Sequence, residues 1–309
     1  MQDLFTGQPT CIRGRSLPTA DQRAALQHNH ERRLAALARL SAAAARVGVG
    51  TDPDDDLVLW PDDELSLLAS ADELWGELAT AVSAFRALTP ILPLDTFGFD
   101  AKAEDPLGDG SPRLHRIGSG VEAWAFVAEE GSVYKFYLPR EGGRIGGSFS
   151  FRPGDDVVIQ ADASLGRYRD LFEKLLLINA LDGMPTEVVG VSPEGVVIAK
   201  QTLGDRLADG MDVTPILPRR LIGIPARFLR AHRDHPRLFF AAGKTWFVAD
   251  THERNLARDR DGGIRAIDLL AAPWPEALSA QEPLLADWLG RARLDPTAPL
   301  LRAVPDDEL

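Results

Sequence analysis

The amino-terminal part of the chain shows apolar side chains at three-residue and four-residue spacing, the period of one face of an α-helix. In residues 19–47 this face includes Leu37 and Leu40, with arginines on the other positions. A second stretch of the same kind covers residues 61–85, and an acidic residue near its start, Asp62, suits a helix amino terminus. The pattern predicts that the first part of the chain is helical.

The pattern changes after residues 90–112, a stretch that is rich in proline and glycine. Short alternating segments now predict strands, and longer segments with one apolar face predict helices. The expected strands are residues 114–117, 123–128, 133–137, 187–192, 196–200, 238–241, 245–249 and 263–268, and the expected helices are residues 164–181 and 219–230. Antiparallel strands mixed with helices predict an α+β fold.

Composition narrows the class of protein. The 309 residues are 45% hydrophobic but contain no apolar run near the roughly 20 residues that span a bilayer, and residues 1–15 are polar. We therefore expect a cytoplasmic protein without a membrane partner. The single cysteine, Cys11, excludes an intrachain disulfide, and the net charge of -12 argues against nucleic acid as a partner. Abundant arginine, alanine and leucine resemble the composition of GC-rich bacterial genomes.

A glycine turn lies between the first two strands of the predicted sheet. Gly118, Ser119, Gly120 and Ala123 form a partial G-x-G-x-x-G motif, which is a weak signal when taken alone because most such turns are ordinary hairpins. In a dinucleotide-binding fold the glycines lead into a helix, whereas here residues 123–128 continue as a strand. A glycine turn between two strands is the arrangement with which kinases cover nucleotide phosphates.

One of the chain's five lysines, Lys135, lies within the apolar strand that follows this hairpin. A buried ammonium group needs a counter-charge, which phosphate oxygens and a helix carboxylate would supply. We expect Glu173 on the next helix to be the protein partner, with Asp170 as the second choice. Taken alone, Lys135 also fits an edge-strand residue whose ammonium group reaches solvent.

A second group of polar residues follows the apolar strand at residues 245–249. Asp250 is followed five positions later by Asn255, and Asp268 comes thirteen positions after that, at the end of another apolar segment. The spacing is typical of a catalytic loop in which the first aspartate orients or deprotonates a hydroxyl group. Asn255 and Asp268 would hold magnesium through oxygen ligands. Singly, Asp250 and Asn255 are also common capping or turn residues.

In their order, spacing and flanking strands these motifs resemble the protein-kinase-like superfamily, most closely the compact kinase domains of bacterial polyvalent proteins from phages and mobile elements. The resemblance covers about residues 110–275. It implies a two-lobed fold with an antiparallel-sheet N-lobe at residues 106–203 and a compact helical C-lobe at residues 204–309. Residues 1–105 would form a helical extension and linker.

The resemblance also implies ATP and Mg²⁺ as cofactors. The residues expected to bind them are Gly118, Ser119 and Gly120 over the phosphates, Lys135 with Glu173 beside them, Lys200, Gln201 and Leu203 in the adenine-contacting hinge, and Asn255 and Asp268 at the metal. Lys135, Asp250, Asn255 and Asp268 would carry transfer of the γ-phosphoryl group to a hydroxyl acceptor on a protein or small molecule.

The chain departs from the family pattern at several positions. Ala123 replaces the third glycine, Leu270 replaces the glycine expected after Asp268, and Val248 with Ala249 replaces the usual His-Arg pair. Few residues follow Asp268, so a peptide substrate is not implied. Two alternatives stay open: a pseudokinase that binds nucleotide or a partner protein without catalysis, and a kinase-fold nucleotidyltransferase.

Overall fold

The computed structural model describes residues 19–49, 57–100, 103, 105, 107, 108, 110–231, 236–241 and 243–297. The polar amino terminus with Cys11 lies outside the described residues. Among the residues described, no helix combines the length and apolar character needed to cross a membrane.

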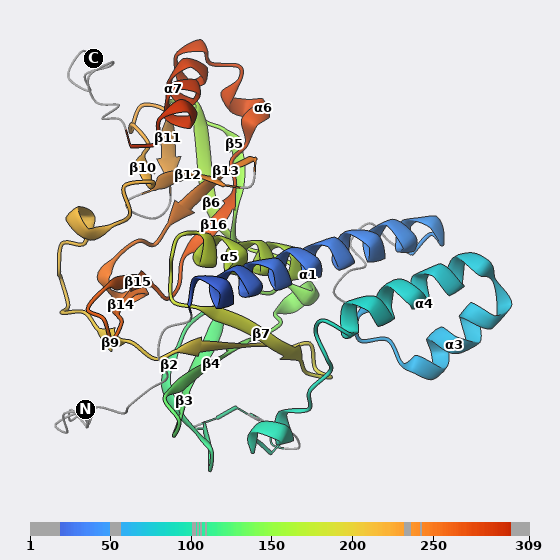
Figure 1. The fold of residues 1–309 in the computed structure, drawn as a ribbon. Coiled ribbons are helices and arrows are strands. Elements are labelled where there is room, and N and C mark those ends of the chain that lie inside the picture. The colour runs from blue at the N-terminus through green and yellow to red at the C-terminus, as the bar shows by residue number, and fades with distance from the viewer. Residues whose placement is uncertain are drawn as a thin grey trace.

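The amino-terminal part is helical in the described residues, as predicted, but the second predicted stretch is divided in two at Asp72. The helices are α1 (Ala20–Arg46), α3 (Asp62–Ala71) and α4 (Glu73–Arg86). Thr19 and Gln22 begin α1 with a capping box, in which each side chain accepts a hydrogen bond from the other residue's backbone N–H. Figure 1 shows α1 lying along α5 (Tyr168–Ala180), while α3 and α4 extend away to the side.

The central element is a six-stranded antiparallel sheet in the order β1-β2-β3-β4-β8-β7. Its strands are β1 (Gly110–Ser111), β2 (Leu114–Ser119), β3 (Ala123–Ala128), β4 (Ser132–Tyr137), β7 (Thr186–Val191) and β8 (Val197–Thr202). The helix α5 lies between β4 and β7 along the chain. The predicted strands and the helix beside them are therefore confirmed, with small changes at their ends.

The two faces of this sheet pack into different cores, because successive side chains of a strand point to opposite sides. Phe126, Phe136 and Ile198 pack with Phe99 on one face. Tyr137, Val197 and Ala199 pack on the other face against α5 and α1. Lys135 is in register with Ala199, on the face that α5 covers, so the lysine enters the core that the helices share.

The carboxy-terminal half is built mainly from strands. A separate core, which we call the carboxy-terminal core, joins four strands to the helix α7 (Pro283–Leu294). The strands are β5 (Gly147–Pro153), β6 (Ile159–Leu165), β11 (Leu229–Ala231) and β13 (Lys244–Ala249). The remaining elements there are β9 (Asp205–Arg206), β10 (Ile222–Gly223), β12 (Arg237–Ala241), β14 (Leu256–Arg258), β15 (Ile264–Ala266), β16 (Leu270–Pro273) and α6 (Glu276–Ser279). Short 3-10 helices cover Leu94–Phe97, Glu141–Gly143, Thr214–Ile216 and Glu253–Asn255.

Two expectations for this half are wrong in the described residues. The helix expected at residues 219–230 is replaced by β10 and β11, because Pro225 lacks the N–H that a helix interior needs. The helical C-lobe is therefore not observed. Strands β5 and β6 were not expected. They fall within residues 106–203, the expected N-lobe, but β5 pairs with β6, β6 pairs with β11, and both strands pack in the carboxy-terminal core.

Candidate active site

The strand pair β13 and β16 brings Asp250 and Asp268 to the same edge of their sheet. The two strands are antiparallel, and Ala249 lies opposite Leu270. Asp250 directly follows β13, and Asp268 comes two residues before β16. The predicted catalytic loop and the predicted metal-binding aspartate therefore meet, although they are far apart in the sequence.

The loop from Asp250 to Asn255 has a defined backbone conformation. Asp250 has a φ of 58°, in the left-handed region that residues other than glycine seldom occupy. Asn255 Nδ2 donates to Asp250 O at 2.9 Å, and Asn255 O accepts from Ile267 N at 2.9 Å and from Asp268 N at 3.3 Å. Asn255 thus links both ends of the loop to the Asp268 segment. Strained residues of this kind cluster at functional sites.

Lys135 reaches the same segment from β4. Its Nζ lies 3.7 Å from Asp268 Oδ2 and also donates to Ile267 O. The side chain is only 8% exposed, so the ammonium group depends on these partners because burial removes its water. Lys135 has a carboxylate as its counter-charge, as expected, but that carboxylate belongs to Asp268.

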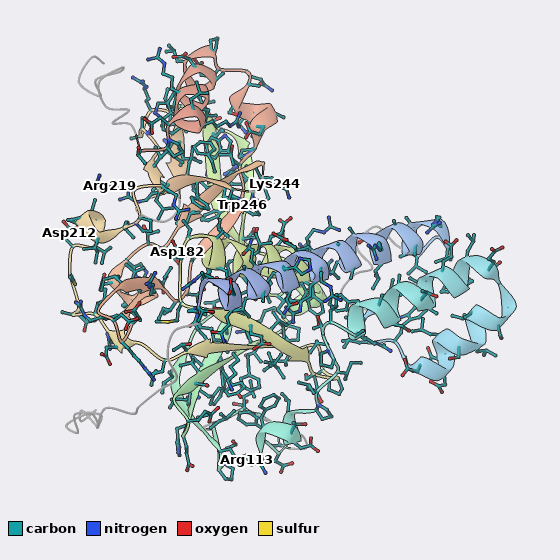
Figure 2. All side chains as sticks on the ribbon, in the orientation of Figure 1. Arg113, Asp182, Asp212, Arg219, Lys244 and Trp246 are labelled. Carbon is teal, nitrogen blue, oxygen red and sulfur yellow. The ribbon has the colours of Figure 1, made fainter. Side chains whose placement is uncertain are left out.

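The predicted pairing of Lys135 with Glu173 is wrong. Glu173 Oε1 instead accepts from Lys244 Nζ at 3.1 Å, and Figure 2 labels Lys244 on the β13 side of α5. The second choice, Asp170, accepts from Arg167 N at 2.8 Å and so caps the start of α5. The rotation of α5 explains both results, since consecutive helical residues point in directions about 100° apart and the next residue, Lys174, faces Lys135's side.

Lys174 also contacts Asp268, and the sequence motifs did not identify it as part of the candidate site. Its side chain is fully buried, its Nζ forms an ion pair with Glu122 Oε2, and the same Nζ lies 3.6 Å from Asp268 Oδ1. Lys135, Lys174, Glu122 and Asp268 therefore form one cluster of two cations and two carboxylates, which we call the four-charge cluster. A lysine surrounded by leucines in residues 171–177 was the signal that could have revealed it.

The pKa directions follow from this geometry. Burial would lower the pKa of Lys174, but the carboxylates of Glu122 and Asp268 outweigh burial and raise it. Burial lowers the pKa of Lys135, which Asp268 opposes only in part. Burial would raise the pKa of Asp268, but the ammonium groups of Lys135 and Lys174 hold it below its usual value. Asp268 and Lys174 are charged in this arrangement.

The glycine turn lies at the exposed end of the β2–β3 hairpin. Gly118 and Ser119 belong to β2, after a bulge, and Gly120 N donates to Ala123 O at 2.9 Å. All three of these turn residues are exposed. The turn is followed by Glu122, so the predicted phosphate-covering segment carries one member of the four-charge cluster.

The predicted hinge residues are held by protein contacts. Gln201 Nε2 donates to Thr186 Oγ1 at 2.7 Å and to Ile267 O at 3.1 Å. Lys200 Nζ lies 3.4 Å from Glu130 Oε1, and Leu203 N donates to Gly131 O at 3.3 Å. Gln201 thus belongs to the network around Asp268, whereas Lys200 and Leu203 contact the β3–β4 turn.

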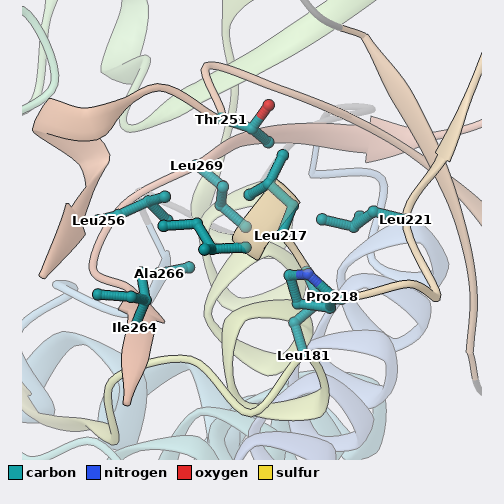
Figure 3. A pocket seen from close by; sticks show the side chains of 10 residues that line it. Leu181, Leu217, Pro218, Leu221, Thr251, Leu256, Ile264, Ala266 and Leu269 are labelled. Carbon is teal, nitrogen blue, oxygen red and sulfur yellow. The ribbon is translucent and has the colours of Figure 1, made fainter. Parts of the chain in front are cut away.

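The apolar pocket in Figure 3 is beside this site and contains none of the predicted nucleotide-binding residues. It is lined mainly by aliphatic side chains, with Thr251 and Leu269 among them. These two residues directly follow Asp250 and Asp268 in the sequence. The pocket therefore lies against the back of the two aspartate segments. In the four-charge cluster the lysines are buried and the carboxylates are partly exposed.

The donors at this site suit a metal that arrives with a substrate. In the residues described, no group of three or more His, Cys, Asp or Glu side chains is placed to hold a metal ion. Asp268 offers carboxylate oxygens, and Asn255 keeps Oδ1 because Nδ2 donates to Asp250 O. Mg²⁺ commonly takes one or two protein oxygen ligands, several waters and substrate phosphates. Asp268 and Asn255 fit that kind of site.

Comparisons with protein-family models, curated proteins and solved structures found no match.

Proposed function

We propose that this chain is a protein-kinase-like phosphotransferase that uses Mg·ATP and transfers the γ-phosphoryl group to a hydroxyl acceptor. The observation that supports this proposal best is the meeting of Lys135, Asp268, Asn255 and Asp250, which come from three separate segments. The antiparallel sheet with α5 between β4 and β7 along the chain also supports the proposal, although β5 and β6 come between β4 and α5.

Each residue has a distinct role in the proposed reaction. Lys135 binds phosphate oxygens, which replace Asp268 as its counter-charge. Asp250 accepts a hydrogen bond from the acceptor hydroxyl and takes its proton as the oxygen attacks the γ-phosphorus, while the bond from that phosphorus to the β–γ bridging oxygen breaks and ADP leaves. Asp268 and Asn255 would hold Mg²⁺, which neutralises charge on the phosphates when bound. The exposed turn at Gly118 and Gly120 covers the phosphate chain.

A pseudokinase that binds without catalysis is the second candidate, because both lysines of the four-charge cluster are already paired with protein carboxylates. A nucleotidyltransferase with the same fold is the third. Transfer of label from α-labelled or γ-labelled ATP separates these reactions: γ-label in the acceptor supports the kinase, α-label supports nucleotidyl transfer, and neither supports the pseudokinase.

The first test of the site is thermal unfolding with and without Mg·ATP. A ligand at a hundred times its Kd stabilises the folded state by about 2.7 kcal/mol, which raises the Tm of a chain of this size by a few degrees. Asp268→Ala should abolish the magnesium-dependent part of this rise, whereas Asp63→Ala, a change at an exposed position of α3, should leave it unchanged. A wild-type protein that does not respond to millimolar nucleotide contradicts the proposal.

Asp250→Asn tests the chemical step separately. The amide cannot accept the hydroxyl proton, so γ-phosphoryl transfer should be lost while the Tm response to Mg·ATP persists. Unchanged transfer by this variant would remove Asp250 from the mechanism.

A further inference from the structure

The four-charge cluster contains a feature that the proposed function does not use. The helix α5 places Lys174 beside Lys135, at the position where the family resemblance implied Glu173. Two ammonium groups thus converge on the two oxygens of Asp268, at 3.7 Å and 3.6 Å. One carboxylate cannot balance two buried cations, and Glu122 supplies the second negative charge.

The members of the cluster differ in their freedom to leave it. The side chain of Lys174 is 0% exposed and that of Lys135 is 8% exposed, whereas Glu122 is 22% exposed and lies beside the exposed glycine turn. Lys174 also lies against the ring of Tyr137, with Nζ 5.6 Å from the centroid. The side chain of Asp268 is 31% exposed, but its Oδ1 also accepts from Leu269 N at 3.0 Å. Glu122 is therefore the charged partner whose rotation towards solvent breaks no hydrogen bond to the backbone.

Hydrogen bonds hold the backbone around Glu122 in place. Leu138 N donates to Glu122 O at 3.2 Å, and Arg140 Nη2 donates to Val121 O at 2.9 Å. Gly120 N donates to Ala123 O at 2.9 Å. A rotation of the carboxylate alone would leave Lys174 buried without its nearest partner, which is costly unless another anion enters.

We propose that Glu122 is a built-in substitute for phosphate, and that a polyphosphate chain displaces it so that Lys174 becomes a second phosphate-binding lysine beside Lys135. The ligand class is a linear polyphosphate, as in a nucleoside triphosphate. The phosphate-binding role of Lys135, the metal at Asp268 and the naming of ATP as the source rest on the proposed function. When Asp268 turns to a metal, both lysines lose its charge, and phosphate oxygens replace it.

The test compares Kd values for inorganic tripolyphosphate without metal, and for Mg·ATP, in four proteins studied by calorimetry. Glu122→Gln removes the internal competitor and should tighten tripolyphosphate binding by roughly tenfold, whereas Lys174→Met should weaken it by roughly tenfold or more. Lys244→Met is the matched control, because it removes another lysine that pairs with a glutamate near α5. It should leave both Kd values unchanged.

A purely structural ion pair gives a different pattern. In that case Glu122→Gln lowers the Tm of the free protein and does not tighten binding, which overturns the inference. Wild-type binding of Mg·ATP with unchanged tripolyphosphate affinity in both cluster variants also overturns it and leaves the proposed function standing. If neither the wild type nor Glu122→Gln binds tripolyphosphate or Mg·ATP, both the proposed function and this inference are overturned. If Lys174→Met does not fold, Lys174→Arg and Glu122→Gln provide the comparison, since the arginine keeps the charge and should keep the binding.

Discussion

His30 on α1 makes the stability of the protein depend on pH. Its ring is fully buried, and Nε2 lies 3.0 Å from Thr186 O on β7. Burial lowers the pKa of His30 from 6.5 to about 4, which the hydrogen bond to Thr186 opposes and the charge of Arg33 reinforces. With Nε2 as the donor, the neutral ring satisfies Thr186 O, so His30 is neutral in the folded protein near neutral pH.

The sign of the effect follows from the two pKa values. Between pH 6.5 and about 4 the unfolded chain binds a proton at His30 and the folded chain does not, so stability falls as pH falls through this range. The loss should reach about 2 kcal/mol at pH 5 and about 3 kcal/mol below pH 4, at about 1.4 kcal/mol for each pH unit between the two values. Above pH 6.5 the contribution is complete.

Urea unfolding at pH 7 and pH 5 measures this loss. Carboxylates also titrate in this range, so the informative quantity is the difference between the wild type and His30→Gln, whose amide can still donate to Thr186 O. The wild type should lose about 2 kcal/mol more than His30→Gln between the two pH values. His28→Gln, at an exposed position of the same helix, is the control and should follow the wild type. Equal losses in the wild type and His30→Gln would refute the argument.

Three further predictions concern packing and turns. Phe85→Ala should cost about 3–5 kcal/mol in urea unfolding, because Phe85 is fully buried against α5, whereas Leu74→Ala, at a 40% exposed position of the same helix, should change stability by less than about 1 kcal/mol. Gly147→Ala should lower the Tm, because a Cβ there would collide with Glu122 and Leu270; an unchanged Tm would contradict this placement. Asp259→Ala should cost about 1–3 kcal/mol, since Asp259 accepts from Gly263 N at 2.7 Å and from Arg265 Nε at 2.7 Å; a cost near zero in urea unfolding would contradict it.

Local patterns predicted the elements that have a strong periodic signal or a clear turn. The helix α1 begins and ends within one residue of residues 19–47, and β12 and β13 lie within one residue of the strands expected at residues 238–241 and 245–249. The strands β5 and β6 were missed although they pair with each other locally, because β6 also pairs with the distant β11 and both strands pack on residues far away in the sequence. Phe149 packs against Phe247, with ring centroids 4.6 Å apart, nearly a hundred residues later in the chain.

The site was predictable as a set of residues but not as a set of partners. Spacing identified Lys135, Asp250, Asn255 and Asp268, and the structure brings these segments together. Spacing could not give the rotation of α5 about its axis, which decides whether Glu173 or Lys174 faces the sheet. That rotation is set by packing of Phe172, Leu175 and other apolar residues into the core, which no local motif records.

The helix α1 takes part in this positioning of α5. It contacts both α5 and β7, and its Leu37 and Leu40 belong to the same core as Phe172. Arg33 Nη2 donates to Val188 O at 2.8 Å, and with His30 it attaches α1 to the edge strand of the six-stranded sheet. Because α1 is fixed to the sheet and packs along α5, it limits how far α5 can turn or slide. The amino-terminal helix therefore helps to hold Lys174 beside Asp268, although it contributes no residue to the four-charge cluster.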